Sequence, residues 1–425
     1  MLYRPDLETA PPDRLRERQL ARLNDLLREI LPANGFYARK LGPLAAPLDW
    51  SGFARLPFTT KPELVADQDS HPPLGTIATH SIDRYVVHHQ TSGTSGRPMF
   101  VLDTEASWQW WAECWRYVYA AAGVTARDRI FFAFSFGPFI GLWAAHAAAR
   151  ELGAMTIPAG GMDSRARLAM LCATKPSVLL STPTYALRLA EVARAEGVDL
   201  RSCGVRVTIH AGEPGASIPS IRARIEDAWG ASAFDHAGAT EVGAFALPCE
   251  TKAALHLNEA EFIVEVLDPA TGVPTAPGER GELVVTNLGR AGWPVIRYRT
   301  GDLVTMGTRR CECGRSFLSL PGGVIGRVDD LMIVRGVNVY PSAIEAIVRQ
   351  FDVDEFRMVR TTSRDMEEVI VELEARDADV DRVAEALRAQ IGVRIPVQRV
   401  EAGALPRFEL KAKRVVDRRS GGGHA

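Results

Sequence analysis

Apolar positions change their spacing along the chain, and the changes predict its main segments. Residues 10–45 carry apolar side chains three or four positions apart, as amphipathic helices do. After residue 129, short β-rich runs alternate with helical stretches. That alternation is typical of a parallel, doubly wound sheet covered by helices. The expected strands are residues 130–136, 155–158, 177–181, 205–210 and a short strand around Phe234. The expected helices are residues 142–152, 165–172, 185–196 and 218–229.

The pattern becomes richer in strands beyond residue 259. Residues 262–267 and 281–286 flank the turn sequence DPATG and predict an antiparallel pair. We therefore expect an α/β fold with a large N-terminal domain, 1–328, which holds doubly wound parallel sheets and a β-rich subdomain at about 245–325. Residues 329–425 predict a small α+β C-terminal domain. Its expected strands are residues 331–334, 356–360 and 369–373. Its expected helices are residues 343–351 and 380–391.

Composition and cysteine usage narrow the class of protein. The chain has 425 residues, of which 46% are hydrophobic and 24% charged, as in ordinary globular proteins. Fifty Lys and Arg against 52 Asp and Glu give a net charge of −2, which argues against a general nucleic-acid binder. Six cysteines are too few for a disulfide framework, and the N-terminus lacks the pattern of a signal peptide. These features predict a reduced, cytoplasmic protein.

The most apolar run, residues 130–149, could suggest a membrane span. Gly137, Pro138 and Gly141 interrupt it, and His146 lies inside it. A strand, a Gly-Pro turn and a buried helix explain the run better. We expect no membrane partner.

A run rich in glycine and hydroxyl groups, TSGTSG at residues 91–96, is the first candidate for chemistry. Glycines let backbone N–H groups turn toward an anion, and hydroxyls add donors. The run is not a Walker A loop, because GxxxxGK[ST] is absent. Taken alone, it is as well explained by a Gly/Ser turn.

Four further segments carry candidate chemistry. In DHAGATEV, Thr240 and Glu241 follow a strand and could hold a phosphate oxygen and Mg²⁺. In RYRTGDL, Asp302 is a suitable acceptor for ribose hydroxyls. Residues 326–346 and the basic tail 405–419 complete the set. A solvated loop carboxylate at Glu241 and a solvated charged tail are the plain alternatives.

Together and in this order, the five segments strongly resemble the adenylate-forming superfamily of acyl-CoA synthetases and ligases. The phenylacetate-CoA ligase branch is the most similar. The stretches CETKAALHLNEAEFIVEVLDPATG, WPVIRYRTGDL, CECGR and IGRVDDLMIVRGVNVYPSAIE resemble that branch almost word for word. The resemblance covers residues 91–418.

The resemblance implies an AMP-forming ligase. A carboxylate attacks the α-phosphorus of ATP, and coenzyme A then captures the acyl-adenylate. The implied partners are ATP, Mg²⁺, coenzyme A and a small aromatic acid of the phenylacetate, benzoate or anthranilate type, and a homodimer is left open. One alternative transfers the acyl group to a carrier-protein pantetheine or an amine. Another is an inactive nucleotide-binding protein, disfavoured because Glu241, Asp302 and Lys411 are present.

Position by position, the resemblance also implies site residues. Thr240 would contact the α-phosphate, Glu241 would hold Mg²⁺, and Asp302 with Arg327 would lie at the ribose. The residues expected around the β- and γ-phosphates are Thr91, Ser92, Gly93, Thr94, Ser95 and Gly96. Those expected on the adenine side are Gly212, Glu213, Pro214, Asp235 and His236.

The resemblance assigns the catalytic lysine to the C-terminal tail. The family pattern PRxEGKAxR places it at Lys411, although Leu410 stands where the family has glycine, and Lys413 is the rival. Asp329 matches the family's hinge, about which the small domain is expected to move, and a plain turn carboxylate is its alternative. The expected coenzyme A-side loop is Arg335, Gly336 and Asn338.

The resemblance places the acyl pocket at residues 134–143, FSFGPFIGLW, which bring aromatic and small residues to a strand end. A second departure from the family bears on the same region. Ala237 stands where an aromatic ring usually covers adenine, so His236 or another ring would cover the base, or the acyl pocket would use the space. The pocket candidates, each also explicable as core, are Phe136, Phe139, Ile140, Gly141, Gly161 and Ala237.

Four residues of the β-rich subdomain form a candidate metal site. Cys249, His256, Cys311 and Cys313 make a Cys₃His set, which suits tetrahedral Zn²⁺ in a structural role. Some ligases of the resembled branch carry such a site. Buried free thiols are the alternative. The other cysteines, Cys114, Cys172 and Cys203, are expected in the core.

Overall fold

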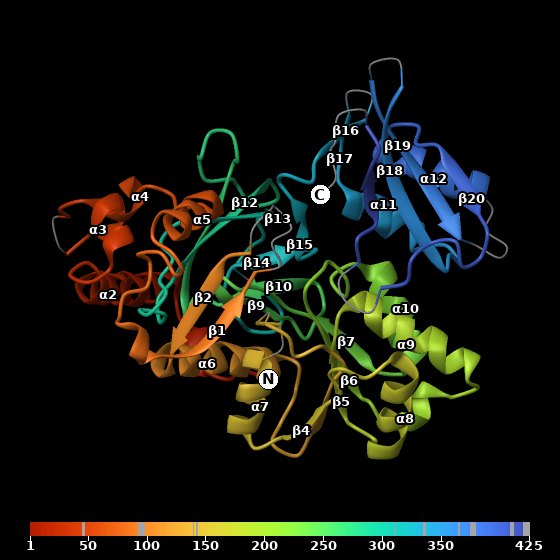
Figure 1. The fold of residues 1–425 in the computed structure, drawn as a ribbon, viewed down its shortest axis with the longest axis horizontal. Coiled ribbons are helices and arrows are strands. Elements are labelled where there is room, and N and C mark those ends of the chain that lie inside the picture. The colour runs from red at the N-terminus through yellow and green to blue at the C-terminus, as the bar shows by residue number, and fades with distance from the viewer. Residues whose placement is uncertain are drawn as a thin grey trace.

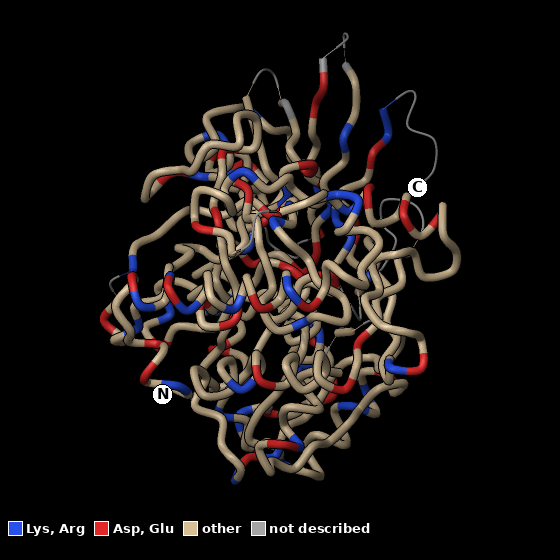
Figure 2. Tube along the Cα trace, turned by 90° about the vertical axis from the view of Figure 1, so that its left-hand side faces the viewer, with Lys and Arg blue, Asp and Glu red and all other residues tan. Residues whose placement is uncertain are grey.

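The computed structural model describes most of the chain, and Figure 1 shows its arrangement. The described residues are 1–44, 47–91, 98–138, 140–141, 143–309, 311–334, 337–363, 366–374, 380–408 and 412–419. No helix among them is long and apolar enough to cross a membrane. Figure 2 shows acidic and basic residues interspersed along the trace, as the small net charge leads us to expect.

A five-stranded parallel sheet forms the centre of the larger part. Its order is β4 (Met155–Pro158), β3 (Arg129–Phe132), β5 (Val178–Ser181), β6 (Val207–His210) and β7 (Ser232–Asp235). Chain order reverses between β3 and β5, which makes their carboxyl ends the place where such sheets bind ligands.

Helices bury both faces of this sheet. Phe131 of β3 belongs to one core and its neighbours Ile130 and Phe132 to the other, because successive side chains of a strand point to opposite faces. The first face packs against α8 (Ser164–Thr174), α9 (Pro183–Ala195) and α10 (Pro219–Trp229). The second packs against α6 (Glu105–Ala121) and α7 (Trp143–Leu152).

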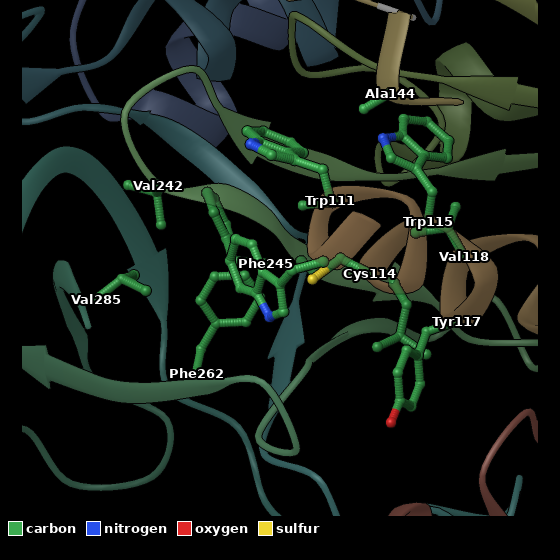
Figure 3. Close-up of a cluster of buried hydrophobic side chains, with 14 of the residues drawn as sticks. Trp111, Cys114, Trp115, Tyr117, Val118, Ala144, Val242, Phe245, Phe262 and Val285 are labelled. Atoms are coloured by element: carbon green, nitrogen blue, oxygen red, sulfur yellow. The ribbon is translucent and has the colours of Figure 1, made fainter. Parts of the chain in front are cut away.

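Antiparallel sheets flank the parallel one. One has the order β14 (Ser319–Pro321), β10 (Ala254–Leu257), β9 (Gly243–Pro248) and β8 (Ala237–Ala239). Another has the order β11 (Phe262–Leu267), β12 (Arg280–Asn287), β13 (Tyr298–Thr305) and β15 (Val324–Arg327). Strands β1 (Tyr85–Gln90) and β2 (Phe100–Thr104) pair around the glycine-rich run. In Figure 3, α6 packs Trp111, Cys114 and Trp115 near Phe245 of β9 and Phe262 of β11.

The N-terminal segment is mainly helical. They are α1 (Pro5–Glu8), α2 (Pro12–Ile30), α3 (Gly35–Leu41), α4 (Trp50–Arg55) and α5 (Lys61–Ser70). Two 3₁₀ turns, η1 (Ile82–Arg84) and η2 (Leu200–Cys203), link later elements. Helix α2 buries Leu15, Leu23, Leu26, Leu27 and Ile30, in agreement with the helical spacing of apolar side chains in this segment.

The C-terminal part has its own core and lies at the upper right of Figure 1. A hairpin of β16 (Met332–Val334) and β17 (Val337–Val339) leads into α11 (Pro341–Val348). A mixed sheet follows in the order β20 (Val397–Val400), β19 (Met366–Glu374), β18 (Glu355–Ser363) and β21 (Val415–Asp417). Helix α12 (Val380–Ile391) packs against it.

The elements that the pattern predicted lie at the expected places and differ mainly at their ends. The strand expected at 130–136 ends at Phe132. Residues 133–138, which include Gly137 and Pro138, form the loop that follows it. One parallel sheet holds all the strands assigned to the doubly wound region. The pattern gave no residue range for α6 or for eleven strands: β1, β2, β8, β9, β10, β13, β14, β15, β17, β20 and β21. None of these strands belongs to the parallel sheet, whose alternation of strands and helices is the pattern that the sequence shows.

A fully buried ion pair ties three of these elements together. Arg290 donates from Nε to Oδ1 of Asp103 at 2.7 Å and from Nη2 to Oδ2 at 2.6 Å. Both side chains are completely buried. Arg290 Nη1 also donates to the carbonyl oxygens of Thr240 at 2.8 Å and Glu241 at 3.1 Å. The pair therefore links the end of β2, the segment after β12 and the turn between β8 and β9.

We expect Asp103→Asn to lower the free energy of unfolding by about 3–5 kcal/mol, because the substitution leaves a buried guanidinium without its counter-charge. The measurement is a urea titration that follows the N-terminal part. Asp25→Asn is the matched control: it breaks the exposed Arg28–Asp25 pair, worth about 0–1 kcal/mol. Equal effects of the two substitutions would contradict this role of Asp103.

Candidate active site

Several of the described candidate residues lie at the carboxyl ends of the parallel strands. Gly212, Glu213 and Pro214 follow β6, and Asp235 ends β7. The loop at 133–138 follows β3 at the order reversal. At this edge each strand ends and the chain turns toward the next helix. Polar side chains from segments far apart in the sequence can therefore lie near one another there.

Arg290 holds the Thr240–Glu241 turn by hydrogen bonds to its backbone. Because Arg290 Nη1 donates to both carbonyl oxygens, the turn cannot shift without exposing a buried charge. Glu241 is itself buried, and its Oε1 lies 3.1 Å from Nζ of Lys61, the first residue of α5. Lys61 escaped the sequence analysis because a lone lysine before a proline carries no motif.

Asp235 offers a free carboxylate oxygen. Its Oδ2 accepts a hydrogen bond from the Ser217 N–H at 2.9 Å, whereas Oδ1 has no partner among the described residues. Burial raises the pKa of Asp235 to about 6. A donor group from a ligand would therefore satisfy an otherwise unpaired buried acceptor.

His236 points into the core. Its Nδ1 lies 2.7 Å from the carbonyl oxygen of Ala246, and its ring centroid is 4.4 Å from that of Trp115. Burial lowers the pKa of His236 to about 4, so the ring is neutral at pH 7 and Nδ1–H is the donor. Packed in this way, the ring is held beside α6. Ala237, next in sequence, is half-buried on β8.

Asp302 and Arg327 face each other across β13 and β15. Arg327 Nη1 lies 3.5 Å from Oδ1 of Asp302 and donates to the Thr300 carbonyl at 2.9 Å, while its Nε reaches Asp329 at 3.0 Å. Gly301 has φ +75°, and a Cβ there would lie 2.4 Å from Arg327 Nη2. The positive φ favours glycine at this position, and the absence of a Cβ leaves room for the Arg327 guanidinium beside Asp302. Asp329 is exposed.

Glu213 joins two distant segments. Its Oε1 accepts a hydrogen bond from the Thr184 N–H of α9, and its Oε2 accepts one from the Ala412 N–H of the tail, both at 2.9 Å. Gly212, just before it, has φ +95°. The loop after β6 therefore contacts the C-terminal tail directly.

An aromatic group lies on the expected acyl side. The ring of Phe136 is 4.8 Å from that of Trp143 and 5.7 Å from that of His146. Ile140 is buried. Gly141 has φ +35°, and a Cβ there would lie 2.8 Å from Phe134, whereas Gly161 has φ +76° and open space around it. Trp143 and His146 were not among the sequence candidates, although α7, which carries both, was expected.

Several candidates lie outside the described residues: Ser92, Gly93, Thr94, Ser95, Gly96, Phe139, Arg335, Gly336 and Lys411. The base of the glycine-rich run is described. Thr91 Oγ1 accepts from the Met99 N–H at 3.1 Å, and the Thr91 N–H donates to the Met99 carbonyl at 2.9 Å. Asn338 is exposed on β17.

The cysteine and histidine candidates form one cluster. The ligand atoms of Cys249, His256, Cys311 and Cys313 all lie within 4.8 Å of one another. Sγ of Cys249 is 3.4 Å from that of Cys311, and Cys313 Sγ is 3.3 Å from His256 Nε2. The other ring nitrogen of His256 faces the Phe317 carbonyl at 3.3 Å, which directs Nε2 toward the thiols.

Known proteins similar to this chain match it over nearly its whole length. The family model described as AMP-binding enzyme matches residues 55–290, and that of the AMP-binding enzyme C-terminal domain matches residues 336–419. The phenylacetate-coenzyme A ligase of Thermus thermophilus is 31% identical over 99% of this chain and 100% of that protein. The phenylacetate-coenzyme A ligase of Pseudomonas putida is 32% identical over 97% and 96%.

Solved structures add the arrangement of the two parts. Crystalline 2-hydroxyisobutyryl-CoA ligase in the postadenylation state is 30% identical, with a TM-score of 0.92 over 97% of this chain and 91% of that one. The same enzyme in the thioesterification state, 31% identical over 98% and 92%, gives 0.75. The two parts of this chain are thus arranged as in the postadenylation state. The chain belongs to the AMP-binding enzyme family, in the branch of the phenylacetate-coenzyme A ligases.

Proposed function

We propose that this protein is an AMP-forming ligase that joins an aromatic carboxylic acid to coenzyme A through an acyl-adenylate. The observation that carries the proposal is the full-length similarity to phenylacetate-coenzyme A ligases, with Asp235, Glu241 and Asp302 in place. We place the boundary between its two domains, and the hinge, at Asp329. We also place the enzyme in the cytoplasm, where ATP and coenzyme A are available.

In the first half-reaction, a carboxylate oxygen of the acid attacks the α-phosphorus of ATP and pyrophosphate leaves. The free Oδ1 of Asp235 would accept a hydrogen bond from the adenine amino group, and Asp302 would accept hydrogen bonds from the ribose hydroxyls. The run from Thr91 to Gly96 would surround the β- and γ-phosphates, and Lys411 would neutralise charge that develops at the α-phosphate. In the second half-reaction, the thiol of coenzyme A attacks the acyl carbon and AMP leaves.

Mg²⁺ fits the Thr240–Glu241 turn by its chemistry. Hydroxyl and carboxylate oxygens are ligands that Mg²⁺ accepts together with substrate phosphates, and its charge neutralises those phosphates when it is bound. One oxygen of Glu241 faces Lys61 in this structure. We infer that Glu241 would hold the ion through a carboxylate oxygen, with Lys61 beside the incoming phosphate charge.

Zn²⁺ fits the cluster of Cys249, His256, Cys311 and Cys313. A Zn–S distance of about 2.3 Å places tetrahedral ligand atoms roughly 3.8 Å apart, which is compatible with a cluster whose ligand atoms lie within 4.8 Å. Cys249 follows β9, His256 lies on β10, and Cys311 and Cys313 precede β14. A bound zinc would therefore connect the end of β9, β10 and the segment before β14, and would have a structural role.

The experiment that tests the proposed function is a pyrophosphate-release screen over aromatic carboxylates, with and without coenzyme A. We expect release that depends on an aromatic acid, and an acyl-CoA product only when coenzyme A is present. Adenylation without any thioester product would point to another acceptor, such as a carrier-protein pantetheine or an amine. No release with any aromatic acid would overturn the proposal.

We expect Lys411→Ala to abolish adenylate formation and to leave capture of a supplied acyl-adenylate by coenzyme A largely intact. A cation directed at developing charge acts mainly in the transition state, and one such donor is worth ~3–4 kcal/mol. Pyrophosphate release and thioester formation are measured separately. Lys413→Ala is the control, and loss of adenylation in that variant alone would reassign the lysine.

Freshly purified, reduced protein should contain one zinc per chain by elemental analysis. Cys311→Ser should remove the metal and lower the melting temperature more than it changes turnover, because the cluster lies at the sheet β14-β10-β9-β8 and not at the carboxyl ends of the parallel strands. Cys172→Ser, outside the cluster, should retain the zinc. Metal-free wild-type protein would exclude the site.

Aromatic acids should exceed acetate and C8–C16 fatty acids in kcat/KM, since each misfitted methylene costs about 1–3 kcal/mol in discrimination. Phe136→Ala should reduce this preference, because it removes one ring of the aromatic group with Trp143 and His146. Phe351→Ala, another half-buried phenylalanine, lies in the C-terminal part and should change nothing in specificity. Octanoate turned over as well as benzoate-type acids would disprove the aromatic preference.

A further inference from the structure

Both carboxylate oxygens of Glu213 accept hydrogen bonds from backbone N–H groups of the protein. Oε1 accepts from Thr184 N–H and Oε2 from Ala412 N–H, each at 2.9 Å. The resemblance places this residue in the loop on the adenine side. Each oxygen keeps a second lone-pair site, but both already have a protein partner in this structure.

The two partners of Glu213 belong to different parts of the molecule. Thr184 lies in the first turn of α9, in the larger part, and Ala412 begins the described stretch of the C-terminal tail. Ala412 directly follows Lys411 in the sequence. The Glu213 carboxylate is therefore a bridge between the nucleotide-side loop and the chain next to the proposed catalytic lysine.

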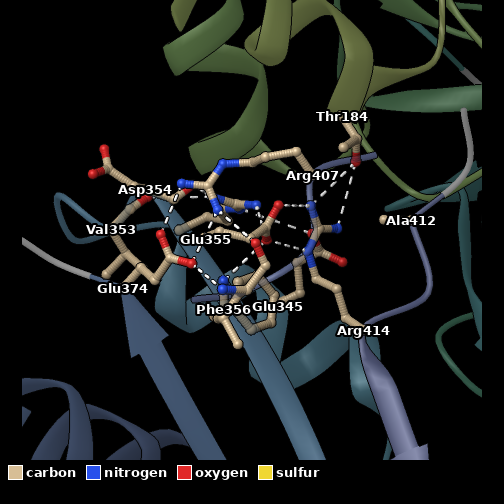
Figure 4. Close-up of polar contacts among 12 residues, drawn as sticks. Thr184, Glu345, Val353, Asp354, Glu355, Phe356, Glu374, Arg407, Ala412 and Arg414 are labelled. Carbon is tan, nitrogen blue, oxygen red and sulfur yellow. Dashed lines mark hydrogen bonds and ion pairs between the residues drawn. The ribbon is translucent and has the colours of Figure 1, made fainter. Parts of the chain in front are cut away.

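A second contact reinforces the same bridge. Arg414 is buried and donates to Thr184 Oγ1 from both Nη atoms at 3.4 Å, and it pairs with Glu345 at 2.9 Å and Glu355 at 2.7 Å. Figure 4 shows Thr184 facing the Arg414 guanidinium, with Ala412 on the adjoining stretch of the tail. Since Glu345 and Glu355 lie in the C-terminal part, Arg414 fixes the tail to its own core while Thr184 and Glu213 fix it to the larger part.

We propose that Glu213 is a positioning residue for adenylation: its carboxylate docks the tail at Ala412, and the role proposed for Lys411, the preceding residue in the sequence, would depend on that docking. This inference rests on the proposed function. The agreement with the postadenylation state, at a TM-score of 0.92 against 0.75 for the thioesterification state, identifies the arrangement in which the bridge exists. When the small part rotates, the Ala412 bond must break, so the second half-reaction does not need it.

The test compares Glu213→Ala and Glu213→Gln with the wild type in the two half-reactions. We expect Glu213→Ala to lower kcat for pyrophosphate release at least tenfold, with KM for ATP and the rate of thioester formation from supplied acyl-adenylate changed less than twofold. Glu213→Gln should be intermediate, because its amide offers one acceptor oxygen for two N–H donors.

Glu226→Ala is the matched control. Glu226 also accepts from a backbone N–H, that of Ala233 at 3.0 Å, and lies on α10, where it pairs with Lys252. Among the described residues of the tail, none forms a hydrogen bond or ion pair with it. We expect both half-reactions of this variant to remain at the wild-type rate. A rise in KM for ATP with kcat retained in Glu213→Ala would return Glu213 to nucleotide binding. An equal loss in both half-reactions would make its role merely structural.

Hydrogen exchange provides a readout that needs no activity. The amide of Ala412 should exchange at least tenfold faster in Glu213→Ala than in the wild type, and as slowly as the wild type in Glu226→Ala. Unchanged exchange would overturn the bridge even if the enzyme adenylates aromatic acids. Conversely, a wild type without adenylation would overturn the proposed function, while faster exchange in Glu213→Ala would still support the docking contact.

Discussion

Arg290 lies wholly inside the protein and uses all three of its guanidinium nitrogens. Two of them bind Asp103 at the end of β2, and the third binds the backbone of the Thr240–Glu241 turn. A buried ion pair of this kind adds little net stability, because desolvation of both charges offsets their attraction. What the pair provides is geometry: it holds the turn that presents Glu241 in register with the hairpin on which the glycine-rich run is mounted.

The other parts of the site are placed by separate elements. Asp235 and the Gly212–Pro214 loop are placed by strands β7 and β6, whose side chains are locked between two helical layers. Asp302 is placed by an antiparallel sheet on the other side, and Arg327 steadies it. Glu241 pairs with Lys61 and Asp302 with Arg327, whereas Asp235 keeps one buried oxygen that has no partner among the described residues and that a ligand's donor would satisfy.

The C-terminal part follows a different design. Its core is separate, and its polar bonds to the larger part include those at Glu213 and Thr184 and the bond of Ser220 to the Ala346 carbonyl at 3.1 Å. Hydrogen bonds of this kind can be exchanged for others at low net cost, whereas a shared apolar core could not. The arrangement suits a ligase whose two half-reactions need different surfaces of the small domain.

The sequence alone determined the alternation of strands and helices, the separate tail and the five motifs, because period and turn chemistry are local properties. It also brought together Cys249, His256, Cys311 and Cys313 as a possible set, which the structure gathers into one cluster. Tertiary structure alone decided the ion pair of Lys61 with Glu241, the burial of His236 against Trp115 and the bridge from Glu213 to Ala412. Each of these joins residues from separate elements, and in a single sequence nothing marks two distant residues as neighbours until the sheet edges and helix faces that carry them have packed together.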